Sequence, residues 1–377
     1  MQKPRKFARP AYPETIKELS LHYLYERTQR YNFILEKLKR LISNILKIFI
    51  PLFCGIALLW YMYGKMDMKE VGKILQYEID YKWILLSAVI GFFSHIVRAA
   101  RWGIQLRALD MNPSMKVLTN AVFGTYAVNL LLPRVGEVWR CGYVAHQENG
   151  SFVKVLGSMI SERLTDTLVV AILAVAVFFM QMNFIDEFLH KYPALKESIE
   201  ATVTTPWLYA AFAGLVLLVI WLFRKKTDNA YINKAKNTVK NLWNGIKTVF
   251  RMKQKWMFLF YTLLMWTLYF LELYVCFFAF KQTSSLGILC AFTCFLLGSI
   301  SMGLPVQGGL GPWHWTIIGA LTLYGLDANV AGTFALVAHG VQFVLIILLG
   351  IYTFFSISLA KKKSKISSEI TEPERIH

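Results

Sequence analysis

The amino-acid sequence predicts an all-α, polytopic integral membrane protein. Its 377 residues are 56% hydrophobic and only 17% charged, whereas soluble domains carry about a quarter charged residues. The apolar residues form long blocks with almost no charge, and a helix needs about 20 such residues to cross a bilayer. The blocks do not alternate with polar residues as the strands of a membrane barrel do. We expect about six to eight transmembrane helices, together with re-entrant broken helices.

The charge balance indicates a membrane surface and argues against nucleic-acid binding. The chain has 41 Lys and Arg against 23 Asp and Glu, a formal net charge of +18. These basic residues lie beside the apolar blocks, as in cytoplasmic loops that face anionic lipid. The five cysteines form no CxxC pair, and no P-loop, HExxH or GxSxG motif is present. We therefore expect no metal, no cofactor and no ATPase activity of its own.

The first 40 residues are predicted to be a cytoplasmic tail followed by a basic amphipathic helix. Between residues 14 and 47, apolar side chains recur at helical spacing with Lys and Arg between them. This pattern is typical of a helix on the inner leaflet or of one packed on the protein. The first transmembrane half covers residues 41–223. Its predicted spans are Ile42–Tyr63, Trp83–Arg101, Phe152–Met182 and Pro206–Phe223.

A basic linker at residues 224–255 is predicted to separate the two halves. Its apolar residues fall on one helical face, which indicates a second amphipathic surface helix. The second transmembrane half covers residues 256–360, and residues 361–377 form a cytoplasmic tail. The predicted elements of this half are spans at Trp256–Phe280 and Val330–Leu359, and between them the block Leu286–Tyr324, which either crosses twice or forms one re-entrant hairpin.

The distribution of positive charge predicts the orientation. Both termini and the linker are strongly basic, so we place them in the cytoplasm and the slightly acidic loop Asn183–Thr205 outside. The span before Val117–Leu132 then ends inside, and the span after it begins inside. That segment therefore cannot cross the membrane, and we predict that it is re-entrant.

A short internal repeat marks two predicted breaks in helices. Leu132–Gly136 and Leu304–Gly308 share the pattern Leu-Pro-x-x-Gly, each ends an apolar block, and a tryptophan follows each. Proline removes a backbone donor and glycine frees the dihedral angles. Paired broken helices in corresponding halves indicate a transporter's binding site. The pattern is compatible with an inverted repeat, and the alternative is two ordinary loops.

Ionisable residues inside apolar segments are costly and are functional candidates by default. The densest set follows the first break and comprises Arg134, Glu137, Arg140, Glu162, Arg163 and Asp166. A helix would place Glu162 and Asp166 on one face and direct Arg163 elsewhere. Guanidinium groups suit a lipid phosphate, and carboxylates suit a cationic headgroup or a proton. The alternative is a salt-bridge network that only fixes the fold.

Plainer roles are predicted for the other ionisable residues of the apolar blocks. Arg98 and Arg101 stand at the end of a span, where arginines snorkel to lipid phosphates. Lone histidines in apolar runs are more often hydrogen-bonded core residues than proton relays, and Glu272 is a candidate partner for one of them. The histidines concerned are His95, His314 and His339.

Three motifs, in order, carry a resemblance to a known family. They are Leu-Pro-Arg-Val-Gly-Glu-Val-Trp-Arg at Leu132–Arg140, Glu-Arg-Leu-Thr-Asp at Glu162–Asp166, and Leu-Pro-Val-Gln-Gly-Gly-Leu-Gly at Leu304–Gly311. From Ile42 to Leu359 the chain resembles the lysylphosphatidylglycerol synthase transmembrane-region family, also called flippase-like. Its bacterial and archaeal members are related to the flippase part of the multiple peptide resistance factor. The chain departs from the family where Pro312-Trp313-His314 replaces the usual acidic residue.

The resemblance implies a flippase-like protein that moves a phospholipid or lipid-linked substrate across the bacterial cytoplasmic membrane. The expected partners are anionic or aminoacylated phospholipids, lipid-linked sugars and a lipid synthase. The tail after Leu359 is too short for the aminoacyl-transfer domain of the family's synthase members, so we expect no enzyme activity. The alternatives are a membrane-embedded transferase with Glu162 or Asp166 as general base, and a scaffold for a partner synthase.

The predicted substrate-binding residues come from both the buried charges and the motifs. They are Arg134, Gly136, Glu137, Arg140, Glu162, Arg163, Asp166, Pro305, Gly308, Gly309, Gly311 and His314. No catalytic residue is predicted.

Overall fold

The fold is known from a computed structural model. It describes residues 27, 29, 35–39, 46, 49–132, 134–191, 193–207, 209–210, 213–214, 217, 221, 233, 236 and 252–371. The predicted N-terminal amphipathic helix, the span Pro206–Phe223 and the basic linker at 224–255 lie largely outside these residues.

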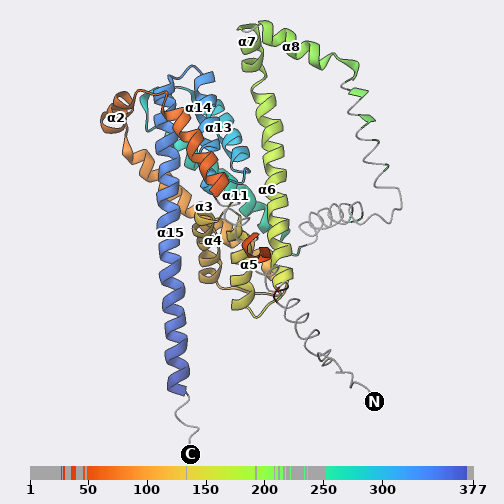
Figure 1. The fold of residues 1–377 in the computed structure, drawn as a ribbon, viewed down its shortest axis with the longest axis vertical. Helices are drawn as coiled ribbons and strands as arrows, with labels where there is room; N and C mark the ends of the chain where they lie inside the picture. The colour runs from red at the N-terminus through yellow and green to blue at the C-terminus, as the bar shows by residue number, and fades with distance from the viewer. Residues whose placement is uncertain are drawn as a thin grey trace, which may run out of the picture. The chain divides into compact units, whose positions relative to one another are not determined.

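The described part of the chain is helical apart from one isolated backbone pairing between Ile79 and Phe280 (Figure 1). The helices long and apolar enough to cross a membrane are α3 (Tyr81–Arg107), α6 (Phe152–Met180), α11 (Lys255–Phe277) and the Ala328–Ala360 part of α15 (Ala328–Thr371). Among the described residues a fifth span is formed if the helix Phe49–Tyr63 and α2 (Met68–Tyr77), which meet at 90°, are counted together. The prediction of an all-α, polytopic membrane protein is confirmed.

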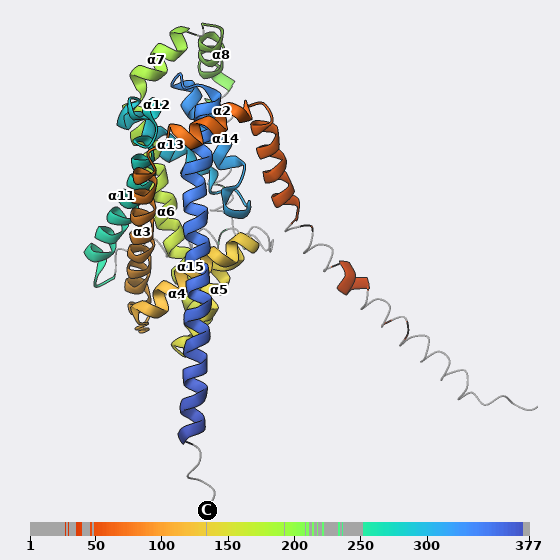
Figure 2. The same cartoon turned by 90° about the vertical axis from the view of Figure 1, so that its left-hand side faces the viewer.

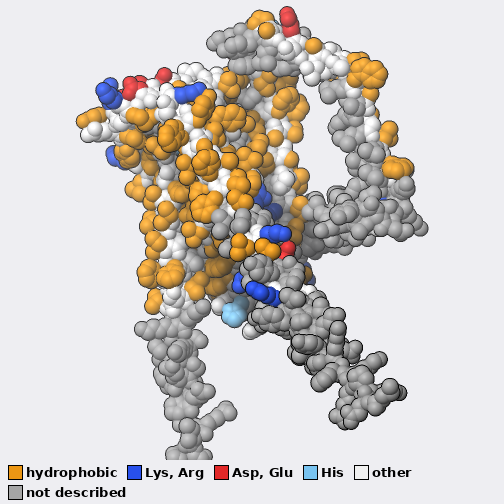
Figure 3. All heavy atoms as spheres, in the orientation of Figure 1, with side chains coloured by type: hydrophobic (Ala, Val, Ile, Leu, Met, Phe, Trp, Pro, Cys, Tyr) orange, Lys and Arg blue, Asp and Glu red, His pale blue; other side chains and the backbone are white. Residues whose placement is uncertain are grey.

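Large apolar side chains cover the outside of the helices. On the face shown in Figure 3 they form a broad area, and charged side chains gather near its two ends. Trp60, Leu263 and Phe354 are each more than two-thirds exposed in the described part of the chain. Such exposure is unfavourable in water and favourable against lipid chains, so it agrees with the membrane assignment.

Helices α3 and α11 form the closest helix pair. The Ser87 hydroxyl on α3 donates to the Glu272 carbonyl oxygen on α11 at 2.7 Å. One turn further along α3, a Cβ atom at Gly91 would lie 2.4 Å from a carboxylate oxygen of Glu272. A small residue at this crossing therefore allows the two helices to approach, as is common between membrane helices.

The first broken segment forms a hairpin of α4 (Met115–Leu131) and α5 (Val135–Gln147). Arg134 begins α5 with a left-handed φ of 63°, which reverses the chain. The two ends of the hairpin meet, because Met111 before α4 and Val144 near the end of α5 pack in one hydrophobic cluster. The segment therefore begins and ends on the same side. Helix α5 has 13 residues, so at about 1.5 Å per residue it is shorter than the ~30 Å hydrocarbon core, as expected for a re-entrant segment.

The second broken segment forms a hairpin of α13 (Gly287–Ser301) and α14 (Pro312–Leu323), with the short turn η1 (Gln307–Gly309) between them. At the end of α6, the Gln181 amide donates to the Leu289 carbonyl at 2.9 Å and to the Tyr324 hydroxyl at 2.6 Å. These two partners lie at the start of α13 and just after α14. Both ends of the segment therefore lie on one side, which two full crossings would also produce. Helices α13 and α14 have 15 and 12 residues, so at about 1.5 Å per residue each is shorter than the ~30 Å hydrocarbon core. Of the two predicted alternatives, the helix lengths favour the re-entrant hairpin.

The two hairpins enter from opposite ends of α6. Val155, in the first turn of α6, packs in the cluster of the first hairpin, whereas Gln181 caps the far end of α6 and binds the second hairpin. The hairpin turns meet, because the Arg134 guanidinium donates to the Gly303 carbonyl. Figure 2 shows α4 and α5 on one level of α15 and α13 and α14 on another. This opposed arrangement is compatible with the predicted inverted repeat.

Several segments predicted as loops are helical. Helix α2 lies within the predicted loop after the first span, and α7 (Met182–Lys191) and α8 (Pro193–Val203) lie in the predicted acidic loop. In α2, the Asp67 side chain accepts from the Lys69 amide at 2.9 Å, and Val71 and Ile74 are buried. The two buried apolar side chains stand three residues apart in a segment rich in both acidic and basic residues. A pattern this short does not predict a helix from the sequence, so α2 is recognised only from its packing in the structure.

We predict that the first hairpin depends on a bare glycine at position 136. A Cβ atom there would lie 2.1 Å from the Thr125 carbonyl oxygen, whereas one at Gly142, on the same helix, would meet no atom within 4 Å. Gly136→Ala should lower stability by about 1–3 kcal/mol because the backbone of α4 must move. Gly142→Ala is the matched control. Thermal unfolding in detergent measures both, and equal melting temperatures would contradict the packing described.

Candidate functional site

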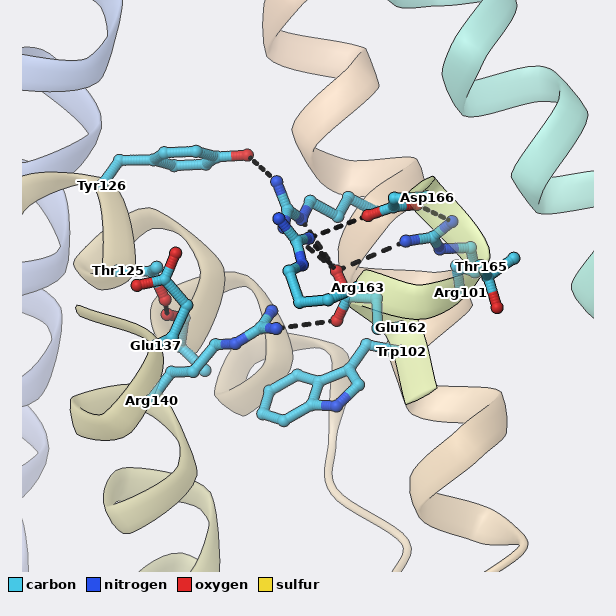
Figure 4. Close-up of polar contacts among 12 residues, drawn as sticks. Arg101, Trp102, Thr125, Tyr126, Glu137, Arg140, Glu162, Arg163, Thr165 and Asp166 are labelled. Carbon is cyan, nitrogen blue, oxygen red and sulfur yellow. Dashed lines mark hydrogen bonds and ion pairs between the residues drawn. The ribbon is translucent and has the colours of Figure 1, made fainter. Parts of the chain in front are cut away.

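A buried cluster of arginines surrounds Glu162, where α3, α5 and α6 meet (Figure 4). Arg140 of α5 contacts one Glu162 carboxylate oxygen at 2.7 Å. Three more guanidinium groups contact the other oxygen: Arg98 at 3.0 Å, Arg101 at 3.3 Å and Arg163 at 2.8 Å. One carboxylate thus joins cations from three helices. We call these residues, together with Asp166, the arginine cluster.

Asp166 extends the cluster by one helical turn. Its carboxylate contacts Arg101 at 2.7 Å and Arg163 at 2.9 Å. Arg101 therefore bridges Glu162 and Asp166, which confirms that the two acids share one face of α6. The prediction that Arg163 points elsewhere is wrong, because its long side chain folds back along its own helix to reach both acids.

Aromatic groups complete the surroundings of the arginines. The Tyr126 hydroxyl on α4 accepts a hydrogen bond from Arg98 at 2.7 Å. The guanidinium of Arg140 lies over the Trp102 ring, 4.5 Å from its centroid, and Figure 4 shows the two side chains side by side. The Trp102 ring is fixed by its own N–H, which donates to Ser158 at 3.0 Å. Cation–π contact and ion pairing together orient Arg140.

The arginine cluster has more positive than negative charge. It contains four arginines and two carboxylates, and positive charge stays in excess even if nearby Glu137 is counted. In the described part of the chain, the Nε and Nη1 atoms of Arg140 are buried without a hydrogen-bond partner. Buried guanidinium donors are normally satisfied, so these atoms are suited to an acceptor group of a ligand.

The cluster reaches the surface at one side. The Arg163 side chain is 40% exposed and that of Asp166 is 16% exposed, whereas the Glu162 and Arg101 side chains are fully buried. A polar group approaching from outside would meet Arg163 first. The interior of the cluster lies beyond it.

Two predicted residues of the first hairpin lie outside these ion pairs. Arg134 donates to the Gly303 carbonyl in the other hairpin. The Glu137 carboxylate accepts from the Asn129 amide at 3.2 Å, and the Asn129 side-chain oxygen in turn accepts from the Gly136 amide at 2.8 Å. Arg134, Gly136 and Glu137 therefore hold the turn and the two helices of the hairpin together.

The predicted residues of the second hairpin form a separate group around its turn. The turn contains three glycines with positive φ angles: 56° at Gly308, 75° at Gly309 and 88° at Gly311. Residues other than glycine rarely adopt such angles. The Gly308 carbonyl oxygen lies 2.9 Å from a ring nitrogen of His339.

The rings beside this turn pack on one another. The His314 and His339 ring centroids lie 4.7 Å apart, and Trp313 stacks on His339. His314 and His339 are each 3% exposed, as expected for core histidines. Pro305 is exposed at the turn. Within the described residues no ion pair joins this group to the arginine cluster.

Sequence reasoning missed Arg98 and Arg101. The prediction that both snorkel to the membrane surface is wrong, because Arg101 is fully buried and Arg98 is 11% exposed. The available signal is their three-residue spacing, which puts them on one face of an apolar helix. That spacing alone does not distinguish a lipid-facing pair from one that meets acids on another helix, because the acids lie 64 and 65 residues away in the chain.

The fold and the cluster define a class of protein: a polytopic helical membrane protein with two opposed re-entrant hairpins and a buried arginine–carboxylate site. The chain belongs to the family of the lysylphosphatidylglycerol synthase transmembrane region, whose model matches residues 44–350. This membership relates the chain to membrane lipids. Comparisons with curated proteins and with solved structures find no match.

We predict that Glu162 is needed for stability. Glu162→Gln removes the negative charge that all four arginines share and replaces one acceptor oxygen by an NH2 donor, and leaving buried cations without their counter-charge costs about 3–5 kcal/mol. The variant should melt at a clearly lower temperature or accumulate poorly in the membrane. Glu187→Gln, on an exposed position of α7, removes the same charge and is the control. Unchanged melting of Glu162→Gln would show that the ion pairs contribute little.

Proposed function

We propose that the chain is a flippase-like lipid translocator that binds the phosphate of an anionic lipid headgroup at the arginine cluster. The observation that carries this proposal is the excess of positive charge around Glu162, together with the unpaired donors of Arg140. A phosphate supplies both the missing negative charge and several acceptor oxygens. Guanidinium groups bind it in a two-point fashion that an ammonium group cannot reproduce.

The exposure of the cluster supports an entry route for the headgroup. Arg163 is the most exposed member, and exposure decreases towards Glu162. A headgroup in the membrane interface would pair first with Arg163 and then with the buried guanidinium groups. Its acyl chains would stay outside, along the exposed apolar face of α6, which includes Leu168, Ile172 and Val175.

The ion pairs of the two acids in the arginine cluster favour transport over catalysis. Glu162 and Asp166 both accept from arginines, and a general base must instead be free to take a proton from its substrate. Two broken helices from opposite sides, with touching turns, are also an arrangement suited to alternating access. The proposed substrate is a phospholipid or a lipid-linked compound, with a lipid synthase as the source of the lipid.

The proposed location is the bacterial cytoplasmic membrane, with both termini and the basic linker in the cytoplasm. The hairpin of α4 and α5 would then enter from the cytoplasmic side and that of α13 and α14 from the outer side. The arginine cluster would lie nearer the cytoplasmic leaflet, since α6 begins at that end.

Cysteine labelling tests this orientation. Single cysteines at the exposed positions Asp110 and Asn149 flank the first hairpin, and one at Glu197 lies on α8. A membrane-impermeant maleimide added to intact cells should label only the last. Labelling of Asp110 and Asn149 from opposite sides would contradict the re-entrant hairpin, and labelling of both from outside would reverse the orientation.

Lipid movement tests the arginine cluster directly. The purified protein is reconstituted into vesicles that contain fluorescent phosphatidylglycerol, and a quencher that cannot cross the membrane reports which leaflet holds it. Arg140→Lys keeps the charge but loses the planar fork, so lipid affinity should fall by about 1–2 kcal/mol, or roughly tenfold.

Arg107→Lys is the matched control, because Arg107 lies exposed at the end of α3 and should tolerate the change. Wild-type lipid movement by Arg140→Lys would contradict phosphate recognition at this site. Absence of lipid movement in the wild type would contradict the proposed function itself.

A further inference from the structure

A second buried acid lies apart from the arginine cluster. Glu272 is in the apolar span α11 and is 5% exposed. Its carboxylate fits against α3 at Gly91, where a Cβ atom would lie 2.4 Å from one of its oxygens. The polar side chain of Gln342 on α15 lies beside its carboxylate. No ion pair of Glu272 occurs in the described part of the chain, which differs from the fully paired Glu162.

One face of α3 connects this acid to the arginine cluster. Gly91 contacts Glu272, His95 lies one turn further on, and Arg98 and Arg101 follow at three-residue steps. Residues at this spacing lie on the same face of a helix. Gly91 and Arg98 are seven residues apart, which corresponds to about 10 Å along the axis.

Polar rings fill the space between the two sites. The His95 ring lies 4.6 Å from the Tyr126 ring and 6.4 Å from the Tyr269 ring, and Tyr269 precedes Glu272 by one turn of α11. The Nδ1 atom of His95 is buried without a hydrogen-bond partner among the described residues. The Tyr126 hydroxyl accepts from Arg98 at 2.7 Å, so the rings beside His95 reach the arginine cluster.

We infer that Glu272 is a proton-binding site whose occupancy is coupled to binding of the anionic headgroup at the arginine cluster. The inference rests on the proposed function, and it adds that a proton is the ion whose movement is coupled to lipid transport. A proton from water on one side binds a carboxylate oxygen of Glu272 and leaves to water on the other side after the conformational change. The lipid phosphate and the proton would move together.

The sign of the coupling follows from electrostatics. The excess positive charge of the arginine cluster disfavours a proton on Glu272, and a bound phosphate reduces that positive charge. Phosphate binding therefore favours proton binding, and by linkage a bound proton favours the phosphate. Two unit charges about 10 Å apart, at an effective dielectric constant of about 20, change each other's binding by roughly tenfold.

Ionisable groups on the same helix and on the surrounding helices must be separated from Glu272 in the test. They are His95, Arg98 and Arg101 on α3, Tyr126 on α4, Tyr269 and Cys276 on α11, and His339 on α15. The arginines stay charged. Of the remaining groups, His95 is the one placed between Glu272 and the arginine cluster, so it is the competing candidate for a pH effect.

The experiment measures movement of fluorescent phosphatidylglycerol in vesicles with equal pH on both sides or with an imposed pH difference of either sign. Wild-type movement should be faster when the side that the lipid leaves is acidic, and slower when the difference is reversed. Glu272→Gln, which resembles the protonated acid, should still move lipid but without dependence on the pH difference. Glu187→Gln is the matched control and should behave as the wild type does.

The outcomes separate the two proposals. No lipid movement under any condition overturns the proposed function together with the inference. Lipid movement that ignores the pH difference in the wild type overturns only the inference. The inference is also overturned if Glu272→Gln still responds to the pH difference. Loss of that response in His95→Gln instead would assign the pH effect to His95.

A second variant covers the case in which Glu272→Gln does not reach the membrane. Gln342→Leu removes the polar side chain beside the Glu272 carboxylate and keeps the acid itself. It should shift the pH at which lipid movement is half-maximal. An unchanged pH profile would overturn the inference.

Discussion

The negative charge of Glu162 must be balanced inside the protein, and this requirement connects the helices of the first half. Its carboxylate is fully buried and contacts Arg98 and Arg101 of α3, Arg140 of α5 and Arg163 of its own helix. A buried charge without partners is strongly unfavourable. The positions of α3, α5 and α6 are therefore set by one shared acceptor. The same arrangement leaves excess positive charge, so the interaction that orders these helices also creates the candidate binding site.

The second constraint is that the backbone must be hydrogen-bonded where helices break at membrane depth. Each hairpin meets it with a hydrogen bond from a side chain to its turn or to the helix start beside it. Asn129 binds the Gly136 amide in the first hairpin, and His339 binds the Gly308 carbonyl in the second. Arg134 donates to the Gly303 carbonyl and so joins the two turns. The two turns are thereby held against one another.

The two halves of the chain carry different polar groups at their hairpins. The first hairpin lies beside the arginine cluster, whereas the rings of Trp313, His314 and His339 surround the turn of the second. Between them, one face of α3 carries His95 and Arg98 and contacts Glu272 of the second half through Gly91. Membership of the lysylphosphatidylglycerol synthase transmembrane-region family relates this arrangement to membrane lipids. The charged site in one half and the separate buried acid in the other are the two places at which the proposed lipid and proton would bind.

Hydropathy and charge in the sequence were sufficient to predict the helical membrane fold, the two broken helices and the re-entrant first hairpin, because these depend on local composition and on the positive charge of loops. The shared face of Glu162 and Asp166 followed from helical spacing alone. The partners of these acids did not, since Arg98 and Arg101 lie 64 and 65 residues before them in the chain. Nor did the choice between a re-entrant hairpin and two crossings for the block that contains α13 and α14, which depends on how long those two helices are. Spacing determines which side chains share a face of one helix, but only the packing of helices decides which faces meet and therefore which buried charges are paired.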